Sequence, residues 1–320
     1  MAERVRTHGW LFAGGLAITL LIANIVAAPA FGKPSNWPEE LATLAPFAVV
    51  AMAQTPAILA GNGGIDLSVG PLTVLANVMI IEWFLPHSGL SSGWVAIPVV
   101  VAICAAIGGL NGFLVTVLRY QSVIATLCTF FVLAGVIAKI APTPKSALHA
   151  AWLTHLSDKV GPIPGGLILI AAPLAVWFAL SRTAYHRNLY ATGGNDATAF
   201  SAGVNVTTTR IVAFALGGAF AGIAGIALTA LVQTTQSAGF AQYTLIALAA
   251  VALGGTSLGG GRGGLVASLL GACCIYLMQT LLGALSVSSS WLNFVYGALL
   301  VVGVVVGAKL LTLRPRGATA

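Results

Sequence analysis

The chain has 320 residues, of which 58% are hydrophobic and only 7% are charged, and its formal net charge is +7. Because a soluble domain carries about 25% charged residues, this composition excludes a soluble globular protein and predicts an all-α integral membrane protein. The basic residues are scattered singly along the chain, which argues against nucleic acid as a partner.

Ten apolar runs are candidate transmembrane helices, and together they predict a single membrane domain over residues 1–320. Arg4 and Arg6 precede the first run, as in a signal peptide, but the run is longer than a usual signal core and is expected to remain as the first span. The ten runs cover residues 10–31, 41–60, 66–85, 94–118, 121–141, 165–181, 210–231, 241–254, 264–285 and 291–311.

Lysine and arginine are distributed unevenly between the two sides that these spans define. With the N-terminus in the cytoplasm, the inner side holds Arg4, Arg6, Arg119, Arg182, Arg187, Arg210, Arg262, Lys309, Arg314 and Arg316. The outer side holds Lys33, Lys139, Lys145 and Lys159. This excess of inner positive charge predicts that both termini are cytoplasmic.

The stretch "GNGGIDLSVG", residues 61–70, places four glycines and Asp66 between the second and third spans. A charge within a bilayer is costly, and broken backbone is tolerated there when it lines a cavity or is buried in protein. One interpretation is therefore a discontinuous element beside a transport path. The other is a plain cytoplasmic turn in which Asp66 caps the next helix. The two interpretations are compatible.

Several polar residues in or near the spans need hydrogen bonds in a medium without water. They are candidates for lining the path of a polar solute, and each is also open to a simpler role in helix–helix hydrogen bonding. The candidates are Asn62, Asp66, Ser68, Asn77, Asn111, Gln279 and Asn293. Three glycine pairs at four-residue spacing, Gly108/Gly112, Gly218/Gly222 and Gly303/Gly307, are expected to serve intrachain helix packing.

Residues 182–209 form a long loop on the predicted cytoplasmic side. Gly193-Gly194 indicates a turn, after which Asn195 or Asp196 can cap a short helix, "ATAFSAG", that Gly203 would end. This helix would expose Phe200 and could dock a partner, although an ordinary solvated loop is the alternative. On the outer side, residues 142–164 predict a short surface helix between prolines.

No set of residues indicates an enzyme, a cofactor or a metal site. Gly259, Gly261 and Gly264 match a dinucleotide-binding pattern, but they follow an apolar helix and no βαβ unit surrounds them. No GK[ST] ending is present, so the chain has no P-loop of its own. The histidines lack ligand spacing, and the four cysteines lie inside apolar runs as small hydrophobic residues.

Four blocks, in order along the chain, resemble the ribose-type sugar permeases of ABC importers. They are "GGIDLSVG" (63–70), "NGFLVTVLRYQSVIATL" (111–127), "YATGGNDATAFSAGVNV" (190–206) and "ALAAVALGGTSLGGGRGG" (247–264). The block "IDLSVG" also separates the chain from branched-chain amino acid and nucleoside permeases. Two departures, Ser122-Val123 and Gln242-Tyr243-Thr244, stand where the family often has Pro-Phe and acidic residues, and they leave the sugar unspecified.

The resemblance implies a bacterial inner-membrane subunit with the ten-helix, type II fold of vitamin B12 importers, working as a pair with itself or a sister chain. It further implies an ATPase partner with two fused ABC domains and a periplasmic binding protein that delivers a monosaccharide or polyol. It makes residues 182–209 the coupling loop that docks on the ATPase. The candidate coupling residues are Arg187, Tyr190, Gly193, Gly194, Asn195, Asp196, Ala199, Gly203 and Val204.

An ion-coupled secondary transporter of a small polar solute is the alternative function. Asp66 or Glu82 would then carry a proton or sodium ion. Glu82 lies near the outer end of its predicted span, where a simple interfacial acid is the plainer interpretation.

Overall fold

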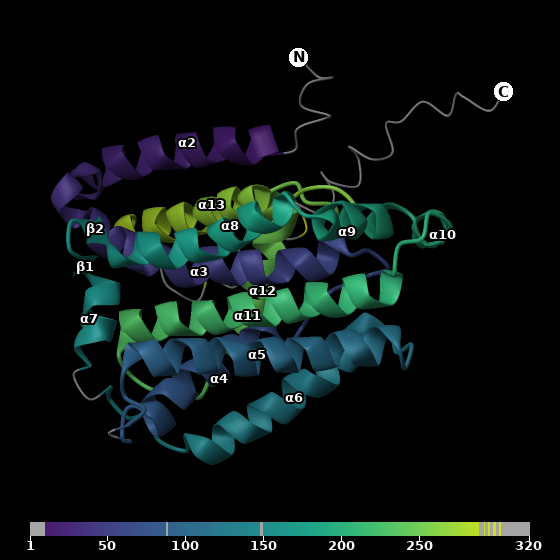
Figure 1. Cartoon of the computed structure of the whole chain (residues 1–320). Helices are drawn as coiled ribbons and strands as arrows, with labels where there is room; N and C mark the ends of the chain where they lie inside the picture. The colour runs from purple at the N-terminus through teal and green to yellow at the C-terminus, as the bar shows by residue number, and fades with distance from the viewer. Residues whose placement is uncertain are drawn as a thin grey trace.

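The computed structural model describes residues 10–87, 89–147 and 150–287, and beyond these only residues 291, 294, 297, 298 and 301. The described chain is almost entirely helical (Figure 1). Its elements in order are α2 (Trp10–Ala27), η1 (Pro29–Gly32), η2 (Pro34–Asn36), α3 (Trp37–Leu59), α4 (Val69–Val78), the π-helical segment η3 (Met79–Phe84), α5 (Gly93–Thr116), α6 (Ser122–Ile140), α7 (Ala151–Ser157), β1 (Lys159–Val160), β2 (Ile163–Pro164), α8 (Gly165–Ser181), α9 (Ala184–Gly194), α10 (Asp196–Ser201), α11 (Val206–Val232), α12 (Phe240–Leu253) and α13 (Leu265–Ala284).

The first nine predicted spans each fall on an apolar helix of this series. The third span is divided between α4 and η3, and α11 begins at Val206, four residues before its predicted start at 210. The earlier start has a local cause, because the Asn205 side chain accepts a hydrogen bond from the Thr208 N–H at 3.0 Å and caps the helix. The tenth predicted span, 291–311, lies outside the described residues apart from isolated positions.

Five helices of the described chain are long and apolar enough to cross a bilayer: α3 with η2, α5, α6, α11 and α13. Helices α8 and α9, which meet at a 90° bend, together meet the same criteria as one broken span. Shorter apolar helices cover residues 11–27, 69–84 and 240–253. The structure is therefore that of an all-α membrane protein with interrupted spans.

Helix α3 lies in the interior of the bundle. It packs against α11, α8, α12 and α13, with α2 outside α13 and α5 and α6 outside α11 (Figure 1). Most of α3 and all of α4 are buried, whereas α5 and α6 expose apolar side chains such as Phe131 and Val132, as expected for helices that face lipid or another membrane subunit.

The glycine pairs serve intrachain packing, as predicted, where the structure describes them. A Cβ atom on Gly108 would lie 2.4 Å from the Phe214 carbonyl oxygen, and one on Gly218 would lie 2.2 Å from the Cys104 carbonyl oxygen. Helices α5 and α11 can therefore approach closely only because these residues lack side chains. The pair Gly303/Gly307 lies outside the described residues.

The connection between α6 and α8 contains the predicted surface helix, α7, which is followed by the two-stranded hairpin β1–β2. The Trp152 indole donates to the Ser91 carbonyl at 3.0 Å and holds α7 against the loop before α5. Figure 1 places α7 and the hairpin at the end of the bundle opposite α9 and α10.

Candidate functional site

Three glycine-rich segments that are far apart in the sequence meet at one point, which we call the glycine junction: Gly61, Gly193, Gly260 and Gly261. Gly61 follows the end of α3, Gly193 lies in the last turn of α9, and the other two precede α13. The Gly261 N–H donates to the Leu59 carbonyl at 3.1 Å. The junction therefore joins the end of α9 to the breaks that follow α3 and α12.

The backbone segments that meet at the junction are so close together that they leave no room for side chains. A Cβ on Gly193 would lie 1.8 Å from the Leu59 oxygen and 2.5 Å from the Gly261 nitrogen. A Cβ on Gly260 would lie 2.4 Å from the Gly61 Cα. Gly61 and Gly260 also have φ values of +76° and +93°, which glycine adopts more readily than other residues.

A series of tilted and edge-on ring contacts holds α9 beside the junction. The Tyr190 phenol donates to the Gly263 carbonyl at 2.8 Å, and its ring lies 4.8 Å from that of His186. The His186 ring lies 5.3 Å from that of Trp177 on α8.

Helix α10 overlaps the short helix that the sequence predicts over 197–203, beginning one residue earlier and ending at Ser201. Asn195 caps it by accepting from the Thr198 N–H at 3.0 Å, and Gly203, at φ +82°, follows its end. Asp196 in its first turn lies 2.6 Å from Arg210 of α11. Arg210 also donates to the Ala60 carbonyl at 3.2 Å, so one guanidinium joins α10 to the end of α3.

The candidate coupling residues divide into two groups by their exposure. Tyr190 and Gly193 face the junction, and Ala199 is buried, with its carbonyl accepting from the Val204 N–H at 3.0 Å. Arg187 is exposed, and Phe200, which the sequence predicts to be exposed, has 74% of its surface exposed. The helix therefore presents an unpaired aromatic side chain at this end of the bundle.

Three of the candidate path residues form one buried network. The Asp66 Oδ1 atom accepts from the Ser68 N–H at 2.8 Å and from the Ser68 hydroxyl at 2.6 Å. The Asn111 amide donates to the Ser68 hydroxyl oxygen at 2.8 Å, and the Thr129 hydroxyl donates to the Asn111 oxygen at 2.5 Å. Asp66 thus forms a turn immediately before α4, while its Oδ2 atom is buried with no described hydrogen-bond partner.

Neighbouring helices hold the backbone of the same segment. The Gln54 amide pairs with both the N–H and the carbonyl of Asp66, at 2.9 and 2.8 Å. The Ser122 hydroxyl donates to the Ile65 carbonyl at 2.8 Å, and the Thr126 hydroxyl accepts from the Leu67 N–H at 3.0 Å. Thr244 of α12 donates to the Leu67 carbonyl at 3.1 Å. Of these supporting residues, only Ser122 and Thr244 stand out in the sequence, as departures from the family pattern.

The remaining path candidates do not join this network. The Asn77 amide donates to the Thr229 hydroxyl at 3.1 Å, and its oxygen accepts from the Gln236 N–H at 2.8 Å, so it holds the loop after α11. Asn62 is exposed beside the junction, and Gln279 is half-buried on α13. Asn293 lies outside the described residues.

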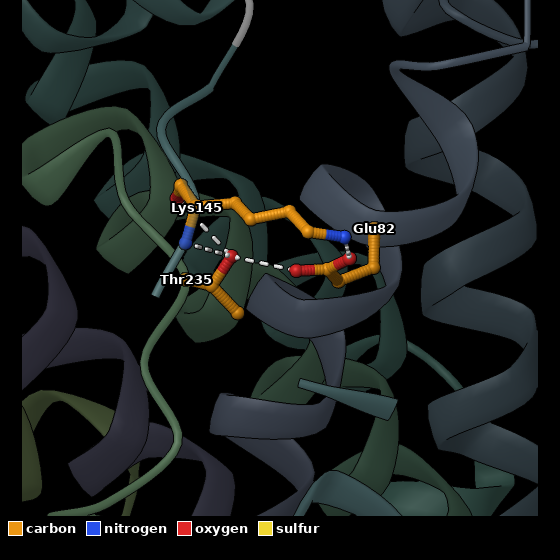
Figure 2. A network of polar contacts seen from close by, with 3 residues as sticks. All are labelled: Glu82, Lys145 and Thr235. Carbon is orange, nitrogen blue, oxygen red and sulfur yellow. Dashed lines mark hydrogen bonds and ion pairs between the residues drawn. The ribbon is translucent and has the colours of Figure 1, made fainter. Parts of the chain in front are cut away.

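A polar network at the other end of the bundle joins three segments, as Figure 2 shows. The Lys145 ammonium lies 2.6 Å from the Glu82 carboxylate, and the Thr235 hydroxyl donates to the same carboxylate at 3.3 Å. The Thr235 N–H donates to the Lys145 carbonyl at 2.8 Å. The Glu82 side chain is only 6% exposed, so these partners take the place of water around its carboxylate. The sequence predicts that Glu82 lies near the outer end of a span, but it gives no sign of the pairing with Lys145.

Known proteins similar to this chain are membrane permeases. Residues 39–304 match the family described as branched-chain amino acid transport system/permease component. The chain is 33% identical to the ribose import permease protein RbsC of Escherichia coli K12, over 96% of this chain and 97% of that protein. It is 32% identical to the ribose import permease protein RbsC of Bacillus subtilis 168, over 92% and 91% of the two chains.

More distant similarity extends to the D-allose transport system permease protein AlsC of Escherichia coli K12, at 28% identity over 90% of this chain and 88% of that protein. No solved structure matches the chain. The chain therefore belongs to the family of branched-chain amino acid transport system permease components, and it is an integral membrane transporter permease and not an enzyme.

Proposed function

We propose that this chain is the membrane-spanning subunit of an ABC importer that takes up a monosaccharide or a related polyol. The observation that carries the proposal is the connection between exposed α10 and the segments that follow α3 and α12, through the glycine junction and Arg210. The names of the relatives, which are permeases for ribose and D-allose, support a sugar as the cargo.

The proposed topology has ten spans in one domain over residues 1–320, with the type II fold and both termini in the cytoplasm of a bacterial inner membrane. A relative from Escherichia coli K12, 30% identical, is described as an inner membrane ABC transporter permease protein. Arg210 pairs with Asp196 of α10 and lines one cleft together with Arg119. Lys159 lies on β1, which Figure 1 places at the opposite end of the bundle, and Lys145 is hydrogen-bonded to Thr235, just beyond the end of α11. This separation supports the orientation predicted from charge.

The proposed coupling loop, residues 182–209, seats on an ATPase with two fused ATP-binding domains. Phe200 and Arg187 would contact the ATPase, while Tyr190 and Gly193 would pass movement of α9 to the backbone at Gly61 and Gly261. These breaks lead directly to the segment that carries Asp66. A motion of the ATPase would therefore be transmitted to the segment between the end of α3 and the start of α4.

In the proposed importer, Asp66, Ser68 and Asn111 shape the path by fixing the start of α4, and Asn62, Asn77, Gln279 and Asn293 are further path candidates. A second permease subunit completes the path, and a periplasmic binding protein docks at the end that carries Glu82 and Lys145. The buried position of Asp66 supports a structural role for its carboxylate rather than direct contact with the sugar.

The alternative is an ion-coupled transporter of a small polar solute. One observation favours it: the Asp66 Oδ2 atom is buried without a described partner, as expected of an acid that binds a proton during a cycle. Glu82 is a weaker candidate because Lys145 already neutralises its charge.

Co-purification with the proteins encoded beside this chain tests the proposed function. The complex, in detergent or nanodiscs, is assayed for ATP hydrolysis with the binding protein and a panel of pentoses, hexoses and polyols. A stable complex whose ATPase rises with one sugar would support the importer and identify the cargo. A chain that purifies without an ATPase and still transports would favour the ion-coupled alternative.

A further inference from the structure

A polar cleft opens at the end of the bundle that carries α10. It lies between the end of α5, the loop before α6 and the start of α11, and its volume is about 450 Å³. Its polar lining includes Asn62, Arg119, Gln121, Thr207 and Arg210. These side chains are rich in hydrogen-bond donors, and none of the residues that line the cleft is acidic.

The cleft carries a net positive charge. Arg210 is paired with Asp196, so its charge is largely compensated. Arg119 has no ion-pair partner among the described residues. The cleft thus presents one uncompensated guanidinium, whose planar fork of donors matches the oxygens of a phosphate.

Two helices begin at the cleft, and their N-termini add to its positive electrostatic potential. Helix α6 begins at Ser122 and α11 at Val206, and both residues line the cleft. The N-terminus of α6 has no side-chain cap, so the N–H groups of its first turn lack a side-chain acceptor. Helix N-termini favour anions because their N–H groups and dipole point toward the ligand.

The backbone beside the cleft is held in an uncommon conformation. Asn62 has φ +53° and Arg119 has φ +59°, two of the four non-glycine residues with left-handed backbone in the described chain. At Arg119 the turn is closed by a hydrogen bond of 3.2 Å from the Tyr120 N–H to the Leu114 carbonyl. Such strained residues persist where the surrounding structure fixes them, and they concentrate at ligand sites.

The cleft borders an apolar surface that a bilayer would cover. Leu118, Tyr120 and Ile124, on either side of Arg119 in the sequence, each expose more than half of their surface. A cationic, donor-rich cleft beside such a surface at headgroup level matches an anionic lipid. We propose that the cleft binds the phosphate of an anionic phospholipid of the cytoplasmic leaflet, with Arg119 as its counter-ion. The proposal rests on the cytoplasmic placement of this end in the proposed function.

The test measures lipid binding to the purified full-length chain by thermal unfolding in neutral detergent, with three probes: short-chain phosphatidylglycerol, short-chain phosphatidylcholine and inorganic phosphate. The variant is Arg119→Gln, and Arg119→Lys keeps the charge without the guanidinium fork. The matched control is Arg182→Gln, which removes an exposed arginine at the end of α8 that lies 4.4 Å from the Phe178 ring centre. Size-exclusion elution and unfolding without added lipid show that each variant is folded.

Phosphatidylglycerol is expected to stabilise the wild type and Arg182→Gln, and its half-saturating concentration should rise about tenfold or more in Arg119→Gln. The half-saturating concentration for Arg119→Lys should fall between those of the wild type and Arg119→Gln. Phosphatidylcholine should have little effect on the unfolding temperature of any of them. Equal binding by Arg119→Gln and the wild type would overturn the site. If inorganic phosphate alone stabilised the wild type as much as phosphatidylglycerol does, the ligand would be free phosphate, and the lipid proposal would be overturned. Because transport is not measured, failure here is distinct from failure of the importer proposal.

Discussion

Replacing Gly193 by alanine is expected to damage coupling because the new Cβ would have no space. It would lie 1.8 Å from the Leu59 oxygen, whereas ordinary contacts begin at 3.4 Å. The obstructing atoms are backbone, so the segments must separate by more than about 1 Å, and overpacking of this kind costs about 1–3 kcal/mol or more. The gain in helix propensity from glycine to alanine is only about 0.5–1 kcal/mol. The clash therefore outweighs the gain.

The adjacent residue provides a matched control, since a Cβ on Gly194 would meet no atom within 4 Å. Gly194→Ala should leave thermal stability unchanged or slightly higher, whereas the same change one residue earlier should lower both thermal stability and binding-protein-stimulated ATPase activity. The measurements are thermal unfolding of the purified permease and ATP hydrolysis by the assembled importer. Equal thermal stability of the two variants would refute the tight junction between α9 and the segments that follow α3 and α12.

Three further predictions follow from the polar contacts. Arg210→Met should reduce stimulated ATPase activity more than Asp196→Asn does, because only the first change also removes the hydrogen bond to the Ala60 carbonyl; similar losses would contradict this. Lys145→Met should lower the free energy of unfolding by about 1–3 kcal/mol, because it leaves the nearly buried Glu82 charge without its cation. Glu82→Gln should lower it less, and chemical denaturation measures both variants. Asp66→Ala removes both hydrogen bonds from Ser68 and should lower uptake at equal expression, and normal uptake would exclude its role at the start of α4.

Much of the fold could be predicted from sequence because each span needs a continuous apolar run. The short helix α10 was predictable from a local signal, a capping Asn195 followed by Gly203, and both residues act as predicted. Boundaries were less predictable where tertiary contacts decide them. The third span is one apolar run in sequence, yet α4 begins only at Val69, because Asp66 and Ser68 form a turn that other helices support.

The site was predictable in its parts but not in its assembly. The glycines at 61 and 193 each indicate a break or a turn, but nothing local shows that they touch each other and Gly261. Asp66, Ser68 and Asn111 were all path candidates, and their joint network depends on how α5 packs beside the start of α4. The pairing of Glu82 with Lys145 joins residues 63 positions apart and carries no signal in one sequence.

Uptake into proteoliposomes tests the central claim most directly. The permease is reconstituted with its ATPase, the binding protein is supplied outside, and uptake of radiolabelled sugars is measured with ATP inside, with and without a protonophore. The importer account predicts uptake of a monosaccharide or polyol that requires ATP and the binding protein and is unaffected by the protonophore. Uptake that proceeds without the ATPase and collapses with the proton gradient would contradict it.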